Sequence, residues 1–166
     1  MKKLVLTAAI AVFTLANINA QQIGVLGGIT SLQFAGDGES DSETGFHLGI
    51  FTEFDLSDGI ILQPELTYAT VDEFDALSVN GIFKYGVSDN FNVQAGPQFG
   101  YALGDNFDSD DYTKLNLQLA VGAGYAISDN LIAQIRYGFQ LNNHYTGDGD
   151  YDNKINSLSV SLGYRF

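Results

Sequence analysis

The chain ends in the stretch Ser157-Leu-Ser-Val-Ser-Leu-Gly-Tyr-Arg-Phe166, in which apolar and polar side chains alternate without a break. Successive side chains of a β-strand point to opposite faces, so this stretch predicts a strand with one apolar and one polar face. The apolar face carries Leu158, Val160, Leu162, Tyr164 and Phe166. That face must be buried against either protein or lipid.

The same alternation recurs along the chain and predicts eight strands. They are expected at about 22–34, 46–54, 60–70, 76–87, 91–102, 113–127, 131–142 and 154–166. Three short segments between them read Ser57-Asp58-Gly59, Ser88-Asp89-Asn90 and Ser128-Asp129-Asn130, and each is typical of a tight hairpin turn.

Four acidic segments alternate with these turns. They contain Asp37, Glu39, Asp41 and Glu43; Asp72, Glu73 and Asp75; Asp105, Asp108, Asp110 and Asp111; and Asp148, Asp150 and Asp152. Consecutive antiparallel strands send their connections to alternate ends. We therefore expect the short turns and both termini at one end, and four longer acidic loops at the other.

An even number of strands of roughly ten residues, with short turns at one end and polar loops at the other, is what a transmembrane barrel requires. A soluble β-sandwich would show the same alternation. The outward aromatic residues favour lipid, because they fall into two belts near the strand ends, as side chains at membrane interfaces do. The sequence thus predicts an all-β protein, an eight-stranded antiparallel up-and-down transmembrane β-barrel.

The N-terminus has the layout of a cleaved signal peptide. Lys2 and Lys3 precede an apolar run from Leu4 to Ala16, and the small Ala20 precedes Gln21. We therefore expect residues 1–20 to be the signal peptide and residues 21–166 to be the barrel. The chain has no cysteine, so neither a disulfide nor lipid attachment through cysteine is available to it.

The charge is strongly acidic, with 7 Lys and Arg against 20 Asp and Glu, for a net charge of -13. A chain without a basic patch cannot release the counterions of a nucleic acid, so no nucleic-acid partner is expected.

With Phe166 at the extreme C-terminus of such a chain, the sequence resembles the small eight-stranded outer-membrane barrels of Gram-negative bacteria, the OmpX and OmpA transmembrane-domain type of the porin family. The resemblance implies a location in the cell outer membrane. It also implies that the barrel-assembly machinery reads the terminal Phe166, and that outer-membrane lipid and lipopolysaccharide surround a monomeric barrel. Members of this family differ widely in activity, so function does not follow from the fold. A structural or adhesive role at the cell surface is our expectation.

Five charged residues are expected to face the barrel interior: Glu53, Glu65, Lys84, Arg136 and Arg165. Charges held away from water need partners, so we expect Glu65 to pair with Arg136, and Glu53 to pair with Lys84 or Arg165. Eight strands leave little room beyond side chains, which favours a plugged interior. The alternative is a small pore for water, ions or small solutes.

The acidic loops are the expected working surface. Asp148, Asp150 and Asp152 are spaced as at the start of a calcium-binding loop, although glycine is missing at its sixth place and glutamate at its twelfth. A solvated acidic surface, without a discrete site, explains the same residues. An intermediate interpretation is that the acidic loops bind anionic lipopolysaccharide through shared divalent ions. We expect no cofactor beyond such Ca²⁺.

A lipid-modifying barrel enzyme is the alternative of another class, and it would need a His beside a Ser or a carboxylate. The candidates are His47, on an inward face, and His144, in the last loop. The chain has no Gly-x-Ser-x-Gly elbow, and we expect no catalytic residues. A channel for a hydrophobic ligand would need an apolar lumen, which the sequence does not reveal.

Two irregularities interrupt the pattern. Pro64 and Pro97 lie within expected strands, so each is predicted to mark a β-bulge or weakened pairing. In the first strand, Leu26 and Leu32 share a face with glycines while Val25 lies on the other, which leaves the register of that strand open.

Overall fold

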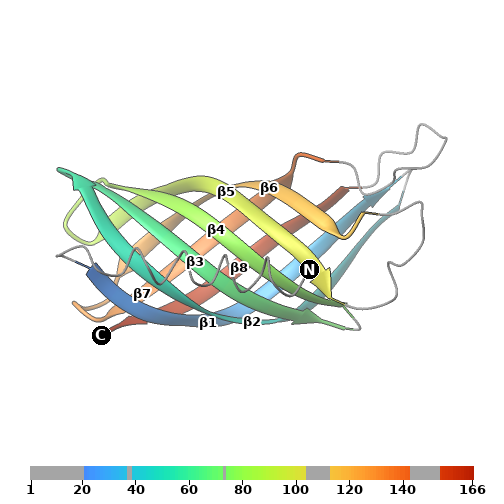
Figure 1. The fold of residues 1–166 in the computed structure, drawn as a ribbon, viewed down its shortest axis with the longest axis horizontal. Coiled ribbons are helices and arrows are strands. Elements are labelled where there is room, and N and C mark those ends of the chain that lie inside the picture. Colours follow the sequence, from blue (N-terminus) through green and yellow to red (C-terminus); the bar gives the residue numbers. More distant parts are fainter. Residues whose placement is uncertain (1–20, 37–38, 73, 104–112, 143–153) are drawn as a thin grey trace, which may run out of the picture.

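The structure, a computed structural model, describes residues 21–36, 39–72, 74–103, 113–142 and 154–166. Its regular elements are the strands β1 (Gln21–Gly36), β2 (Glu39–Ser57), β3 (Ile60–Val71), β4 (Phe74–Gly86), β5 (Phe91–Leu103), β6 (Leu115–Ala126), β7 (Leu131–Gln140) and β8 (Lys154–Arg165) (Figure 1). Within the described part of the chain, no helix is long and apolar enough to cross a membrane. The expected signal peptide, residues 1–20, lies outside the described residues.

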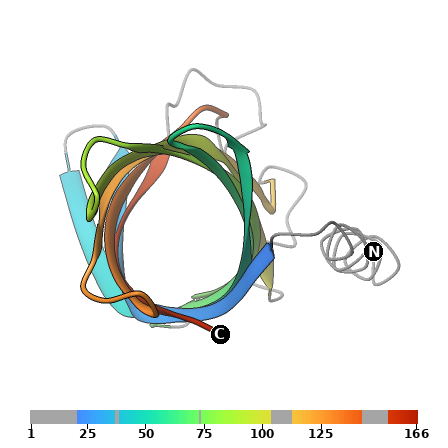
Figure 2. The same cartoon turned by 90° about the vertical axis from the view of Figure 1, so that its left-hand side faces the viewer.

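The eight strands form one closed barrel in chain order, and β1 pairs with β8 to close it. Neighbouring strands are antiparallel. Figure 2 shows the ring of strands seen along the barrel axis. The predicted fold class is therefore confirmed. A sandwich of two sheets is excluded, because closure leaves no sheet edge.

The short hairpin turns lie at the same end of the barrel as the C-terminus (Figure 1). Two of them are bonded to the next strand of the ring by equivalent asparagines: Asn90 Nδ2 donates to Ala126 O of β6 at 3.0 Å, and Asn130 Nδ2 donates to Arg165 O of β8 at 2.9 Å. In the first turn, Gly59 adopts a φ of 79°, which only glycine tolerates readily. The repeated Ser-Asp-Asn sequence therefore ties these two turns to the strand that follows each of them in the ring.

The opposite end differs from the prediction in its first two connections. The first acidic segment is mostly strand, because β2 begins at Glu39, which pairs with Gly36 of β1. Between β3 and β4, Val71 pairs with Phe74, and Asp72 takes a φ of 51° in a tight turn. These connections are hairpins rather than long loops. Continued pairing satisfies the backbone hydrogen-bonding groups, whereas the acidic composition suggested loops.

The apolar rows face outward as predicted. The exposed large apolar side chains include Ile29, Phe46, Leu48, Phe83, Tyr85, Leu119, Tyr125, Ile135, Phe139, Leu162, Tyr164 and Phe166. Ile135 is 50% exposed and Leu162 is 55% exposed, so these residues do not converge in a water-excluding protein core. An outward apolar band of this kind is stable only against lipid.

Both prolines interrupt the pairing of their strands without changing its register. The β2–β3 ladder has a gap opposite Pro64, between the pairs Phe51–Glu65 and Phe54–Leu62. The β4–β5 ladder has a gap at Pro97. Each proline keeps its partner on the other side, Pro64 with Gly81 and Pro97 with Leu119. The sequence predicts either a β-bulge or weakened pairing at each proline. The pairing is weakened, and neither position has a bulge.

The irregular first strand reflects apolar side chains inside the barrel. Leu26 packs with Phe51 and Ile132 in one buried cluster. Leu32 packs with Val71 and Ile155 in a second, against which Phe74 also lies. The lumen therefore has apolar parts that the sequence analysis did not identify. Leu26 and Leu32 face inward because they fill space that polar side chains leave in the lumen.

The barrel lumen as candidate functional site

The centre of the lumen holds a buried ion pair between β3 and β7. Arg136 Nη1 and Nη2 donate to the two carboxylate oxygens of Glu65, both at 2.7 Å. Glu65 is 1% exposed and Arg136 is 7% exposed. Two parallel bonds between a guanidinium and a carboxylate are the strongest form of such a pair. The residues that the sequence analysis pairs are thus in direct contact.

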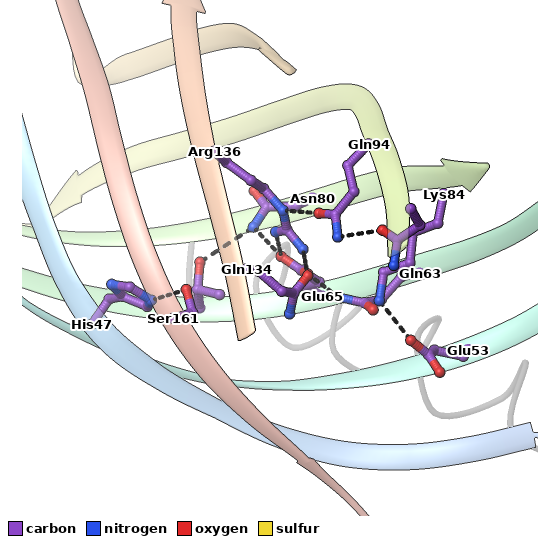
Figure 3. A network of polar contacts seen from close by, with 12 residues as sticks. His47, Glu53, Gln63, Glu65, Asn80, Lys84, Gln94, Gln134, Arg136 and Ser161 are labelled. Carbon is purple, nitrogen blue, oxygen red and sulfur yellow. Dashed lines mark hydrogen bonds and ion pairs between the residues drawn. The ribbon is translucent and has the colours of Figure 1, made fainter. Parts of the chain in front are cut away.

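Amide side chains surround this pair and hydrogen-bond to both of its members (Figure 3). Asn80 Nδ2 donates to Glu65 Oε2 at 3.1 Å, and Gln63 donates to the other carboxylate oxygen. Arg136 Nε donates to Gln94 Oε1 at 2.6 Å, and its Nη2 donates to Gln134. The amides come from β3, β4, β5 and β7, so the network joins strands around much of the ring. Such additional hydrogen bonds offset part of the cost of burying the two charges.

A second group of charges lies in the lumen near the short turns. Glu53 Oε1 accepts from Lys84 Nζ at 2.6 Å, and Glu53 Oε2 lies 2.9 Å from Arg165 Nε. The sequence analysis offers Lys84 or Arg165 as the partner of Glu53, and the structure places both beside it. Lys84 Nζ also lies 5.9 Å from the centre of the Phe51 ring, within the range of a cation–π contact. The carboxylate of Glu53 is therefore shared between two cations.

The lumen contains two chambers that share no lining residue. One, of about 110 Å³, lies toward the loop end and is lined by Leu26, His47, Phe74, Lys114, Arg136 and Ser161 among others. The other, of about 320 Å³, lies at the short-turn end and is lined by Glu53, Asp55, Lys84, Asp89 and Arg165 among others. Buried Phe51, Gln63, Ile82, Gln94, Ile132 and Gln134 line neither chamber. Together with the Glu65–Arg136 pair these six residues form what we call the plug layer.

A histidine of β2 in the loop-end chamber contacts hydroxyl groups on β1 and, across β1, on β8. His47 Nδ1 lies 2.7 Å from Thr30 Oγ1, and its Nε2 lies 2.8 Å from Ser161 Oγ. Both His47 and Ser161 are paired in register with Gly28 of β1, so the ring spans a position without a side chain. Sequence analysis places His47 in the lumen but misses Ser161, which is 114 residues away along the chain.

Other predicted site residues lie elsewhere. Asp148, Asp150, Asp152 and His144 fall outside the described residues. Within the described ranges, no group of three or more His, Cys, Asp or Glu residues is arranged to hold a metal ion. Phe166 is 75% exposed at the short-turn end, and its backbone N–H donates to Ile23 O at 2.9 Å across the β1–β8 seam.

Comparisons with solved structures return small outer-membrane barrels. The neisserial surface protein NspA is 12% identical, with a TM-score of 0.55, over 87% of this chain and 97% of that chain. Ail, the attachment invasion locus protein of Yersinia pestis, is 17% identical, with a TM-score of 0.55, over 87% of this chain and 98% of that one. The outer membrane enzyme PagL is 17% identical, with a TM-score of 0.56, over 87% of this chain and 98% of that chain. At these identities the likeness concerns the fold alone.

No curated protein sequence matches the chain. The family profile for the outer membrane protein beta-barrel domain matches residues 4–166, which is nearly the whole sequence. That match agrees with the closed barrel and its lipid-facing apolar band. The chain therefore belongs to the outer-membrane β-barrel domain family and is a protein of the outer membrane.

Proposed function

We propose that this protein is a closed, non-conducting barrel that anchors an acidic surface at the outside of the cell, in a structural or adhesive role. The observation that carries the proposal is the plug layer, which fills the lumen between the two chambers. A barrel whose interior is filled by bonded side chains offers no continuous path, so its solvent-facing ends are what remain for interaction.

The orientation follows from the two ends of the barrel. The short-turn end, with the C-terminus, faces the periplasm in this proposal, and the acidic end faces outward. The net charge of -13 makes a cationic surface or a shared divalent ion the favoured contact. Outer-membrane lipid and lipopolysaccharide surround the apolar band, and the barrel-assembly machinery recognises Phe166. The protein acts as a monomer and needs no cofactor.

A small pore is the second candidate, and the two chambers favour it. Only the plug layer separates them, so a rearrangement of its side chains joins the chambers into one path. The wild-type protein in planar lipid bilayers is expected to show no stable unitary conductance. A variant with both Glu65→Ala and Arg136→Ala is expected to conduct, because it removes the paired charges and their volume together.

The matched control for this recording is Phe139→Ala, on the same strand as Arg136 but facing outward, where Phe139 is 47% exposed. It is expected to remain silent. A stable and sizeable conductance from the wild-type barrel would contradict the plugged function and establish the pore.

The acidic end is proposed to act as a hydrated, negatively charged surface rather than as a discrete metal site. Calorimetric titration of the folded protein with Ca²⁺ is therefore expected to give no saturable heat. The comparison variant carries Asp148→Asn, Asp150→Asn and Asp152→Asn together. A saturable heat in the wild type that disappears in this variant would instead establish the calcium site.

A further inference from the structure

We propose that Ser161 is a nucleophile activated by His47, and that it accepts short acyl groups from esters that enter the loop-end chamber. The arrangement has the three parts that define an activated serine: a hydroxyl, a histidine within hydrogen-bond reach of it, and a third group that holds the histidine. This inference is independent of the surface role and of whether the lumen conducts. It runs against the sequence-based expectation that the chain has no catalytic residues.

The geometry gives each nitrogen of His47 one partner. With the ring proton on Nδ1, that N–H donates to Thr30 Oγ1 at 2.7 Å. Nε2 is then left to accept the hydroxyl proton of Ser161 at 2.8 Å. This is the tautomer in which a histidine serves as a general base. Thr30 is a positioning residue, since it contacts only the far side of the ring.

The site is rigid and partly closed off from water. Thr30, His47 and Ser161 are each 8% exposed. They lie on β1, β2 and β8, three adjacent strands of the barrel wall. The contact depends on Gly28 between them, where a side chain has no room: an added Cβ would lie 1.9 Å from Val160 O. Figure 3 shows His47 and Ser161 side by side, next to the Glu65–Arg136 pair.

The chamber determines the class of substrate. It holds about 110 Å³, and its wall combines hydroxyl groups with apolar Leu26, Leu32 and Ile155. A cavity of roughly 150 Å³ accommodates benzene, so this one accepts an acyl group of only a few carbons. Phe74 and Lys114 also line it, so the chamber extends toward the loop end, and we expect the ester to enter from there with its leaving group outermost.

The reaction balances without a cofactor. Ser161 Oγ attacks the ester carbonyl carbon and its proton passes to His47 Nε2. The bond from that carbon to the leaving oxygen breaks, and the leaving alcohol takes the proton from His47. An acyl ester on Ser161 remains. Water then attacks this ester with His47 again as base, and it releases the carboxylic acid and restores the hydroxyl.

The test treats the folded, full-length barrel with p-nitrophenyl acetate and locates the acetyl group by peptide mass spectrometry. We expect acetylation of Ser161 in the wild type and none at that position in Ser161→Ala. The matched control is Ser159→Ala, because Ser159 lines the same chamber on the same strand. That variant should keep full labelling of Ser161. Protein unfolded by boiling should lose it.

The role of His47 is tested by the rate of labelling. His47→Gln is expected to lower the rate by about 10²-fold, the lower end of what a positioned base contributes. The wild-type rate should rise with pH to a plateau as the histidine loses its proton, whereas the rate of His47→Gln should rise without a plateau. Thr30→Val should lower the rate and keep the plateau.

Each variant is first checked for folding by its shift in gel mobility on boiling. If His47→Gln does not fold, the comparison of Ser161→Ala with Ser159→Ala still decides the site. The proposal is overturned if folded wild-type protein neither carries an acetyl group on Ser161 nor releases p-nitrophenol faster than Ser161→Ala, or if folded His47→Gln labels that serine as fast as the wild type.

Discussion

Replacing Arg136 by methionine will lower the free energy of unfolding by about 3–5 kcal/mol, the usual cost of leaving a buried charge without its partner. Glu65 is 1% exposed, and both of its carboxylate oxygens accept from Arg136. In the variant, the two amides that remain cannot neutralise the carboxylate. Because the chain has no tryptophan, urea unfolding is best followed by the fraction of protein that keeps its folded gel mobility.

Two further variants separate the charge from the packing. Adding Glu65→Gln to Arg136→Met removes the stranded charge, so the double variant should be more stable than Arg136→Met alone. Lys84→Met should cost less than Arg136→Met, because Glu53 keeps Arg165 at 2.9 Å. Equal losses in the single and the double variant would show that the ion pair is not what Arg136 contributes.

Gly28→Ala is expected to prevent the barrel from closing, or to cost about 3 kcal/mol or more, at or above the upper end for overpacked sites. The added Cβ would lie 1.9 Å from Val160 O and 2.8 Å from Ser161 Cα, both on β8. These are main-chain atoms of the seam where the first and last strands meet, so no side-chain rotation relieves the clash. The measurement is the folded fraction after refolding into detergent micelles, read from gel mobility.

The neighbouring glycine provides the control. A Cβ on Gly27 would meet His47 O at 3.5 Å, an ordinary contact. Gly27→Ala therefore has the same change in composition and in backbone entropy, and it should fold normally. If the two variants fold equally well, steric exclusion at the β1–β8 seam is not the reason for glycine at position 28.

The sequence is sufficient to predict the barrel because alternate residues of each strand face lipid and the lumen. Lipid requires apolar side chains, whereas the lumen holds mostly polar ones. That alternation survives in β6, β7 and β8, where the predicted facing agrees with the observed exposure. It fails in β1, because the lumen is not uniformly polar: Leu26 and Leu32 belong to buried apolar clusters inside it. A periodicity argument cannot distinguish an apolar residue facing lipid from one facing an apolar part of the interior.

Sequence reasoning could predict the ion pairs, because few charges lie on inward faces and few pairings are therefore available. It could not predict the contact between His47 and Ser161. That contact depends on β8 closing against β1 and on the register that sets both residues opposite Gly28. Barrel closure is a property of the whole chain, and no local pattern near His47 carries a signal for a serine 114 residues away.

The two gaps in strand pairing at the prolines lie on either side of the β3–β4 hairpin. The β3–β4 hairpin is paired continuously within itself, from Ile60–Tyr85 to Val71–Phe74, yet both of its outer seams are interrupted. Both ladders that join this hairpin to the rest of the barrel therefore contain a gap in their hydrogen bonding, and we expect local opening of the wall there. The same hairpin carries Glu65 and Asn80. Its local opening would therefore move the Glu65 carboxylate away from Arg136 on the opposite side of the lumen.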